Sequence, residues 1–305
     1  PERYVPPTNT GVPTGQDIDN DGKAVKEPGS RGYGNDAQGF GQFPGQYGML
    51  ILSKYPIEGA AVQQFGRLLW KDMPGASLPR NEDGTDWYSP QALAVLRLSS
   101  KNHVDVPIRF GERFVHLLAS HPTPPAFDGP ERRNARRNHD EIRLWADYID
   151  PTKSEYIVDD AGKNGGLPDG TTFVIVGDLN CDPIDGEGVP GTMDQLLKNP
   201  KIDGAFVPIS AGGPMAVKAN AEQNAGRKGD PTFVTSDFGG EGHGNFRLDY
   251  VLPSKNLKAI AGGIFWPAPG EPGAMAITAS DHRSVWIDIV PVPASVAPLP
   301  VTVPK

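Results

Sequence analysis

The segment Val174-Ile175-Val176-Gly177-Asp178-Leu179-Asn180 constrains this chain more than any other. A short apolar run that ends in Gly-Asp is typical of a buried β-strand whose end presents polar side chains. Asp178 and Asn180 are two residues apart, so the alternation of a strand directs both to the same side. The segment therefore predicts a strand that delivers a carboxylate and a carboxamide to one place.

Three other motifs place polar residues at the ends of predicted strands. His121 follows the apolar segment 113–120, and Asp249 is the second residue of the segment 248–252. Asp281 and His282 lie just before the segment 284–289. If these strand ends converge, they form a pocket of acids, an amide and imidazoles, which suits a divalent metal ion acting on a phosphate ester.

The composition favours a fold rich in turns. The chain of 305 residues holds 37 Gly and 32 Pro, which argues against a helical bundle. The net charge of −8 gives no general attraction to polyanions such as nucleic acid. The single cysteine, Cys181, excludes an intrachain disulfide and is interpreted as a small side chain in a tight loop. No apolar run approaches the roughly 20 residues that span a bilayer.

The predicted elements indicate one domain over residues 1–290. Two sheets packed face to face, with helices outside, accommodate strands whose polar motifs all fall at strand ends. Residues 1–46 are expected to be irregular, and residues 291–305 form a Pro/Val/Ala-rich tail or linker. The strands are expected at 48–53, 104–110, 113–120, 171–176, 248–252 and 284–289, and the helices at 90–98, 128–149 and 193–197.

The residue types suggest a division of roles. Asp178 and Asp281 offer the hard oxygen ligands that Mg²⁺ or Mn²⁺ prefers, and Asn180 approaches a phosphate oxygen without charge repulsion. His282 acts as a base or as a hydrogen-bond donor to phosphate, and Asp249 holds its other ring nitrogen. His121 is a second imidazole that stabilises transition-state charge or protonates the leaving oxygen.

The ordered set of motifs resembles the endonuclease/exonuclease/phosphatase superfamily, which includes deoxyribonuclease I-like enzymes. The resemblance runs from about Tyr47 to Ile289. It implies a four-layered α/β sandwich of two mixed sheets flanked by helices, and Mg²⁺-dependent phosphoesterase activity. The residues that carry it are the segment 47–56, Ser120-His121, Gly177-Asp178-Leu179-Asn180, 248–252 and Ser280-Asp281-His282.

The resemblance also assigns site residues. It implies catalytic roles for His121, Asp178, Asn180, Asp249 and His282, and a metal site at Asp178, Asn180 and Asp281. His121 resembles the second histidine of the deoxyribonuclease branch and points away from the repair nucleases, which place a tyrosine in that region.

One departure from the family pattern concerns the start of the fold. The family begins with a strand carrying an Asn, then a helix, then a strand ending in a metal-binding Glu, and neither strand is found before Tyr47. Glu2 is expected on no strand. The chain opens on Pro1-Glu2-Arg3, so it is interpreted as a processed or truncated product that lacks the N-terminal strand-helix-strand.

Two further groups of charged residues have alternative readings. Asp17, Asp19 and Asp21 match the first half of a Ca²⁺-binding loop, but a polar turn explains them as well. Arg133, Arg136 and Arg247 are candidates for binding substrate phosphate, whereas the arginine-rich face of the helix 128–149 also suits simple solvation.

The predicted function is that of a hydrolase acting on phosphate esters. We expect Mg²⁺-dependent hydrolysis of a phosphodiester, with nucleic acid among the candidate substrates, by in-line attack of an activated water. One alternative is a phosphomonoesterase acting on sugar or inositol phosphates. Another is a non-catalytic module of the same fold, since the first Asn and the metal-ligand Glu are absent. The protein is expected to be a monomer that is secreted or associated with the cell surface.

Overall fold

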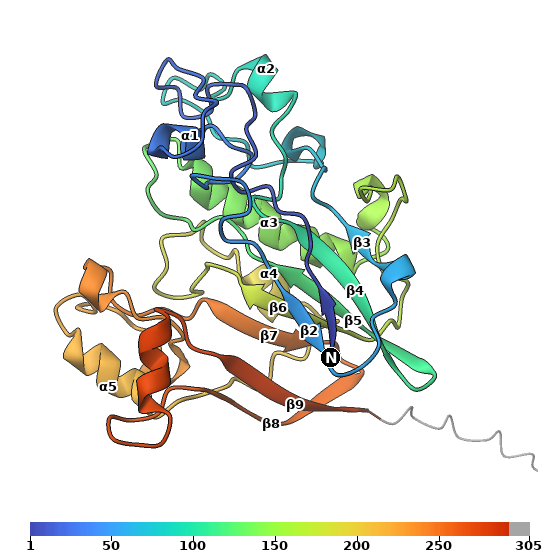
Figure 1. Cartoon of the computed structure of the whole chain (residues 1–305), viewed down its shortest axis with the longest axis vertical. Helices are drawn as coiled ribbons and strands as arrows, with labels where there is room; N and C mark the ends of the chain where they lie inside the picture. The colour runs from blue at the N-terminus through green and yellow to red at the C-terminus, as the bar shows by residue number, and fades with distance from the viewer. Residues whose placement is uncertain (293–305) are drawn as a thin grey trace, which may run out of the picture.

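A mixed five-stranded sheet forms the centre of the computed structural model, which describes residues 1–292 (Figure 1). The strand order is β3-β4-β5-β6-β7, and β5 and β6 are parallel while the other neighbours are antiparallel. The bounds are β3 (Gln63–Gln64), β4 (His103–Phe110), β5 (Arg113–Ser120), β6 (Phe173–Asp178) and β7 (Asp249–Pro253). The predicted α/β class and the positions of β4, β5, β6 and β7 are confirmed, whereas β3 was not predicted.

Two small antiparallel sheets supply the second strand layer. One pairs β1 (Glu2–Tyr4) with β2 (Ile51–Ser53), and the other pairs β8 (Leu257–Ile264) with β9 (Val285–Pro291). The expectation of two mixed sheets is thus correct for the central sheet. Among residues 1–292, the second layer consists of two separate two-stranded sheets instead of one sheet. Strand β8 was not predicted, because its sequence LKAIAGGI shows no clear alternation of apolar and polar residues.

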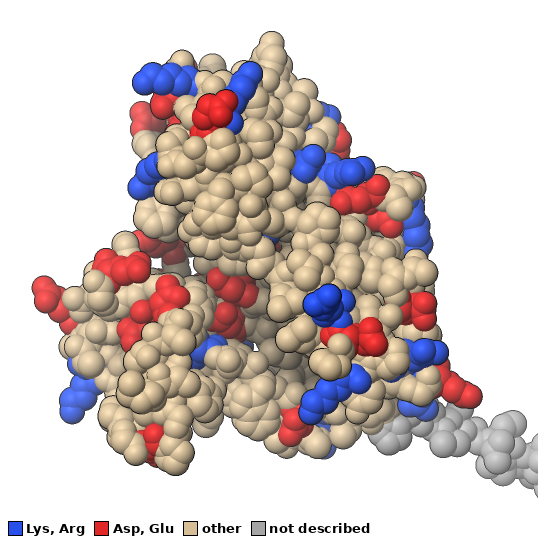
Figure 2. All heavy atoms as spheres, viewed as in Figure 1, with Lys and Arg blue, Asp and Glu red and all other residues tan. Residues whose placement is uncertain are grey.

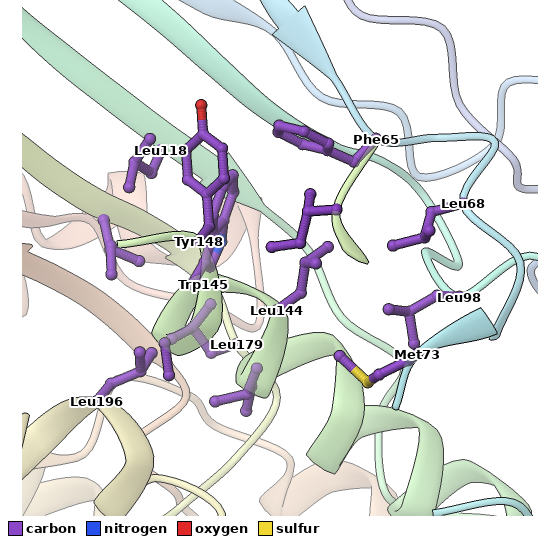
Figure 3. Close-up of a cluster of buried hydrophobic side chains, with 14 of the residues drawn as sticks. Phe65, Leu68, Met73, Leu98, Leu118, Leu144, Trp145, Tyr148, Leu179 and Leu196 are labelled. Carbon is purple, nitrogen blue, oxygen red and sulfur yellow. The ribbon is translucent and has the colours of Figure 1, made fainter. Parts of the chain in front are cut away.

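The long helix α3 (Arg133–Tyr148) covers one face of the central sheet. Alternate strand residues such as Leu118 and Ile175 pack against Trp145 and its neighbours in the main core (Figure 3). The intervening residues, including Val104 and Val106, face the other way and pack beneath Ile51 of β2. Strand alternation therefore separates a face buried under α3 from a face that carries the polar strand ends.

The remaining helices are short. They are α1 (Arg31–Asn35), α2 (Pro90–Leu93), α4 (Asp194–Leu197) and α5 (Gly212–Ala219). Single 3₁₀ turns occupy Gly59–Ala61, Trp70–Asp72, Ser154–Tyr156, Pro231–Phe233, Gly239–Glu241 and Ala274–Ala279. No helix within residues 1–292 combines the length and the apolar character that crossing a bilayer requires.

Two predicted helix boundaries are corrected. Helix α3 begins at Arg133 and not at Asp128, because residues 129–132 form a turn in which Arg132 adopts a positive φ of 52°. Asp128 still caps the helix from outside, since its carboxylate accepts the backbone N–H groups of Asn134 (2.8 Å) and Ala135 (2.9 Å). Helix α2 has the predicted Ser89 cap but ends at Leu93, well before Leu98.

The N-terminal segment is more ordered than predicted. Glu2 lies in β1, opposite Ser53 of β2, and α1 falls within the stretch 1–46 that was expected to be irregular. The segment is held by polar contacts, since the Asn9 side chain donates to the carbonyls of Gly66 and Ser99, each at 2.7 Å. At the other end, β9 runs to Pro291, and residues 293–305 of the predicted tail lie outside the described part.

A buried histidine couples the stability of this fold to pH. His103 of β4 is fully buried, and burial lowers its pKa to about 4 although Glu141 lies nearby. The neutral ring fits its surroundings: Nε2–H donates to the Glu141 carbonyl (2.8 Å), and Nδ1 accepts from the Ser99 hydroxyl (2.6 Å). The unfolded chain, with an ordinary imidazole, binds a proton at higher pH than the folded chain does.

We therefore expect the folded state to lose stability as pH falls from about 6.5 towards 4. The contribution of His103 is about 2 kcal/mol between pH 7.5 and pH 5. The check is urea unfolding of the wild type and His103→Gln at both pH values. The variant should be less stable at pH 7.5 and should lose about 2 kcal/mol less on acidification. Equal losses in the two proteins would contradict this assignment.

Candidate functional site

Two aspartates face each other across the β6–β7 pair. In the antiparallel register, Asp178 at the end of β6 lies opposite Asp249 at the start of β7. Like charges on directly opposed residues destabilise a sheet unless a positive group lies between or beside them. The pair is therefore the position in the fold where a cation, supplied by the protein or by a ligand, is most strongly required.

His282 provides one such group from a distant part of the chain. Its Nδ1 lies 2.8 Å from Asp249 Oδ2, and its Nε2 lies 3.7 Å from Asp178 Oδ2. An isolated antiparallel β-bridge between Ser236 and His282 fixes the backbone of His282. The predicted His282–Asp249 dyad is present in the structure, with the free ring nitrogen directed towards the second carboxylate.

His121 and Asn180 complete the cluster. His121 follows β5, the parallel neighbour of β6, and its Nε2 lies 3.3 Å from Asp178 Oδ2. Asn180 donates its backbone N–H to Asp178 Oδ1 (2.9 Å) and its side-chain Nδ2 to the Pro122 carbonyl (3.1 Å). Asn180 has a φ of 51°, a left-handed conformation that Asn tolerates better than most residues and that often marks functional positions.

Gly177 allows β5 and β6 to approach closely at this point. A Cβ at Gly177 would lie 1.9 Å from the Ser120 carbonyl oxygen, and its φ of +148° is disfavoured for other residues. Ser120 and Gly177 directly precede His121 and Asp178. The absence of a side chain at this position therefore sets the distance between the two functional groups.

The two imidazoles of the site differ in charge. Burial opposes charge on His282, but the hydrogen bond and charge of Asp249, together with Asp178, raise its pKa to about 9. Burial, aided by the positive charges of Lys101 and His282, holds the pKa of His121 well below its ordinary value. Burial and the charge of Asp249 raise the pKa of Asp178 to about 7. Divergent pKa values of this kind are a feature of sites that move protons.

The cluster is open to solvent on one side. Between 17% and 26% of the side-chain surface of Asp178, Asp249, His121 and His282 is exposed. Figure 2 shows acidic side chains gathered around a hollow next to the lobe that carries α5, beside the first residues of β7 in the same view. A small ligand can therefore reach the group from outside.

Asp178, Asp249 and His282 are the residues best placed to hold a metal ion. Each offers a ligand atom within 4.8 Å of the others. Two opposed carboxylates beside an imidazole form a donor set that fits a hard divalent cation. Asp281, the predicted ligand, is not in this group: it is exposed, and its backbone carbonyl accepts the N–H of Asp237 (2.8 Å).

Several residues that support the site were not predicted. Thr235 Oγ1 accepts the backbone N–H groups of Leu248 (2.9 Å) and Asp249 (3.1 Å) and so fixes the start of β7. Lys101 is buried near Asp178 and His121, and burial lowers its pKa to about 8 although Glu141 and Asp178 partly offset the effect. Neither residue belongs to a motif, and burial of a lone lysine has no local sequence signal.

The three arginines predicted to bind phosphate are placed differently from one another. Arg133 donates to the Ile18 carbonyl (3.1 Å), and Arg136 donates to the Glu131 carbonyl (3.2 Å) and to Ser77. Arg247 stacks over the Tyr250 ring at 4.7 Å, and within residues 1–292 no carboxylate lies within salt-bridge distance of its guanidinium. It lines a cavity of about 280 Å³ together with Asp182 and Phe233. Phosphate binding by these arginines stays a prediction.

The remaining predicted groups have simple structural explanations. The carboxylates of Asp17, Asp19 and Asp21 cluster, and they accept backbone N–H groups of their own loop, such as that of Gly22 (2.9 Å). A polar turn therefore accounts for this loop, and Ca²⁺ binding stays a prediction. Cys181 is buried, and burial raises its pKa to about 12, which suits the non-reactive interpretation.

Comparisons with known proteins identify the family of the chain. The model of the endonuclease/exonuclease/phosphatase family matches residues 10–282. A structure of that family from Beutenbergia cavernae is 16% identical with a TM-score of 0.47, over 95% of this chain and 53% of its own. Sphingomyelinase C from Streptomyces griseocarneus is 15% identical with a TM-score of 0.39, and the match covers 80% of this chain and 64% of the sphingomyelinase. The human Nocturnin catalytic domain is 12% identical with a TM-score of 0.42, and the match covers 95% of this chain and 72% of that domain.

The chain thus spans about half the length of the Beutenbergia cavernae protein and less than two thirds of the sphingomyelinase. No curated protein matches its sequence.

We expect Gly177→Ala to destabilise the protein by about 3 kcal/mol or more, because the new Cβ collides with the Ser120 carbonyl. The matched control is Gly170→Ala, whose φ is also positive (+78°) but whose Cβ would meet nothing within 4 Å; about 1 kcal/mol is expected there. Urea unfolding of the two variants checks this. Similar losses in both would show that close approach at Gly177 is unimportant.

Proposed function

The chain belongs to the endonuclease/exonuclease/phosphatase family, and we propose from its site that it is a divalent-metal-dependent hydrolase of phosphodiesters. The observation that carries this proposal is the Asp249–His282 dyad, held at 2.8 Å and directed at Asp178. Carboxylate, imidazole and amide groups that converge in one open pocket are the inventory needed for in-line attack of water on phosphorus.

In the proposed mechanism, the dyad moves the proton of the attacking water. Asp249 accepts the Nδ1–H of His282, so Nε2 is the atom that would take a proton once a bound cation offsets the carboxylates that raise the pKa of the ring. Asp178 orients the water from the other side, and the free N–H of Asn180 binds a phosphate oxygen. His121 Nε2 lies 3.3 Å from Asp178 Oδ2, the oxygen that His282 also approaches. Its neutral ring would donate a hydrogen bond to the leaving oxygen, which takes its proton from solvent.

A divalent cation fits this scheme through the charge that it supplies. Bound at Asp178 and Asp249, it would neutralise the carboxylates that raise the pKa of His282 and would polarise the phosphate. The residues that would hold it are Asp178 and Asp249, the opposed pair of β6 and β7, and Mg²⁺ or Mn²⁺ is the proposed ion. Asp281 is not in the cluster that these residues form with His282, and its role as a ligand stays a prediction.

The electrostatics of the pocket favour a diester over a monoester. A phosphodiester carries one negative charge near neutral pH, whereas a phosphomonoester carries close to two. The pocket already holds two aspartates, so the second charge increases repulsion. The net charge of −8 disfavours long polyanions, and a substrate with a single phosphodiester is proposed ahead of nucleic acid. Arg247, two residues before Asp249, is the proposed contact for a further anionic group of the substrate.

Exposed apolar side chains in the two small sheets bear on the alternative that this fold is a non-catalytic module. Leu50 and Leu52 around β2, and Ile260 of β8, each expose more than half of their surface. We propose that further strands pair with these two small sheets in the intact protein and contribute the Asn and the metal-binding Glu of the family pattern. Secretion or surface association remains part of the proposal and follows from the loop-rich composition.

The test of the function uses the full-length protein and two chromogenic substrates. We expect bis(4-nitrophenyl) phosphate to be hydrolysed with Mg²⁺ present, and 4-nitrophenyl phosphate to be hydrolysed more slowly. EDTA should abolish the activity, and excess Mg²⁺ should restore it. Turnover that persists in EDTA would contradict metal dependence, and no turnover of either substrate would favour the non-catalytic module.

His282→Ala is expected to lower kcat for the diester about 10²–10⁴-fold, because the group that accepts the proton of the attacking water is lost. The matched control is His243→Ala, since His243 is exposed and, within residues 1–292, forms hydrogen bonds only through its backbone, with Phe238 and Arg227. Steady-state kinetics of the two variants decide the point. Unchanged turnover in His282→Ala would remove the dyad from the mechanism.

The proposal of missing strands has its own check. Residues 1–305 and the complete product of the gene are compared in Mg²⁺ titration and diester hydrolysis. The complete product should bind Mg²⁺ at least about tenfold more tightly, because a ligand is added to the shell. Equal affinity and turnover would show that no ligand from outside residues 1–305 takes part.

A further inference from the structure

Lys101 is a buried cation that the proposed mechanism leaves without a role. Only 6% of the residue is exposed. Its ammonium group has three N–H donors, and among the described residues it makes one hydrogen bond, from Nζ to the Pro122 carbonyl at 3.2 Å. Burying a cation with so few partners is costly, so its presence calls for an explanation beyond packing.

A structural ion pair does not explain this lysine. The charge of the buried Glu141 partly offsets the lowering of the Lys101 pKa, but the two groups form no ion pair. No carboxylate in residues 1–292 lies within 4.0 Å of Lys101 Nζ. Both oxygens of Glu141 are already occupied: Oε1 accepts from the Ser100 N–H and Oε2 from the Thr123 N–H, each at 2.6 Å. Glu141 therefore fastens two loops to α3 and does not serve as a direct partner for Lys101.

The Pro122 carbonyl connects Lys101 to the site. This oxygen accepts from Lys101 Nζ and also from Asn180 Nδ2, at 3.1 Å. Pro122 directly follows His121, so one carbonyl joins the buried cation to an imidazole and an amide of the cluster. Asn138 of α3 ties the same two loops together, donating to the Thr123 carbonyl (2.8 Å) and to the Leu179 carbonyl (2.9 Å).

The Pro122 carbonyl fixes the orientation of the Asn180 side chain. With one N–H bonded to Pro122, the side chain of Asn180 keeps its other N–H and its Oδ1 free to face a ligand. A hydrogen bond from an ammonium group is stronger than one from a neutral donor, so it holds the carbonyl in a fixed direction. Loss of that bond would allow the loop 121–123 to move, and the amide with it.

We propose that Lys101 is a positioning residue for the phosphoesterase site, and that it acts through the Pro122 carbonyl on Asn180 and His121. This inference rests on the proposed function for its kinetic consequences. Its geometric content, the bond from a buried ammonium to the carbonyl that holds Asn180, stands independently of turnover. Lys101 itself touches neither Asp178 nor the dyad.

The kinetic test is a double-mutant cycle in the full-length protein with the chromogenic diester. Lys101→Met is expected to lower kcat about 10–100-fold with KM changed less than about threefold. Asn180→Ala should lower kcat as well, and adding Lys101→Met to it should have little further effect, because the two act as one unit. Lys198→Met, an exposed lysine paired with Asp194, is the control and should leave kcat unchanged.

A second variant and a second measurement cover a loss of folding or of activity. Lys101→Gln removes the charge but keeps an N–H donor. The side-chain amide NMR signal of Asn180 should shift in Lys101→Gln and in Lys101→Met, and should stay in place in Lys198→Met. This signal reports the geometry whether or not the protein is an active phosphoesterase.

The outcomes separate the two proposals. A wild type without diesterase activity overturns the proposed function, and the amide signal then decides the positioning role by itself. Active wild type with independent, multiplicative effects of Lys101→Met and Asn180→Ala overturns the positioning role and leaves the function standing. An amide signal of Asn180 that is unchanged in both Lys101 variants overturns it as well.

Discussion

The opposition of Asp178 and Asp249 across two antiparallel strands is the constraint on which the rest of the site depends. The register of β6 and β7 fixes the two carboxylates face to face, and a sheet does not place like charges there without compensation. His282 compensates in part, through its 2.8 Å contact with Asp249. The two carboxylates are the basis of the proposed cation site, while burial and the neighbouring charges together give the groups of the pocket divergent pKa values.

Backbone geometry converts this charge pair into a defined pocket. Gly177 lets the parallel strands β5 and β6 approach until their ends meet, which brings His121 beside Asp178. Asn180 then turns back in a left-handed conformation, so its amide returns to the same pocket. Beneath them, Asn138 and Glu141 of α3 hold the loops that carry these residues. The helix that buries the core therefore also supports the site.

Strand-borne features of this molecule were accessible from the sequence, and contacts between distant segments were not. The Val174–Asn180 segment predicts both a buried strand and its polar end, because alternation and the Gly-Asp turn are local properties. The convergence of His121, Asp178, Asp249 and His282 followed from their shared position at strand ends. The metal-ligand role of Asp281 stays a prediction, because adjacency to His282 does not fix the direction of its side chain.

Other differences have the same origin. Strand β1 has three residues and β8 contains two glycines, so neither produces a periodic pattern. The start of α3 was shifted because Asp128 caps the helix from beyond an intervening turn. Lys101 and Thr235 act through bonds to residues more than ten positions away, and such bonds leave no trace in composition or spacing.

The central claim, that Asp178 and Asp249 together hold a divalent cation, is tested most directly by anomalous diffraction from crystals of the protein soaked in Mn²⁺. The account predicts a peak within bonding distance of carboxylate oxygens of both Asp178 and Asp249, next to His282. A peak confined to the Asp17–Asp21 loop, or its absence from the pocket at saturating Mn²⁺, would contradict it.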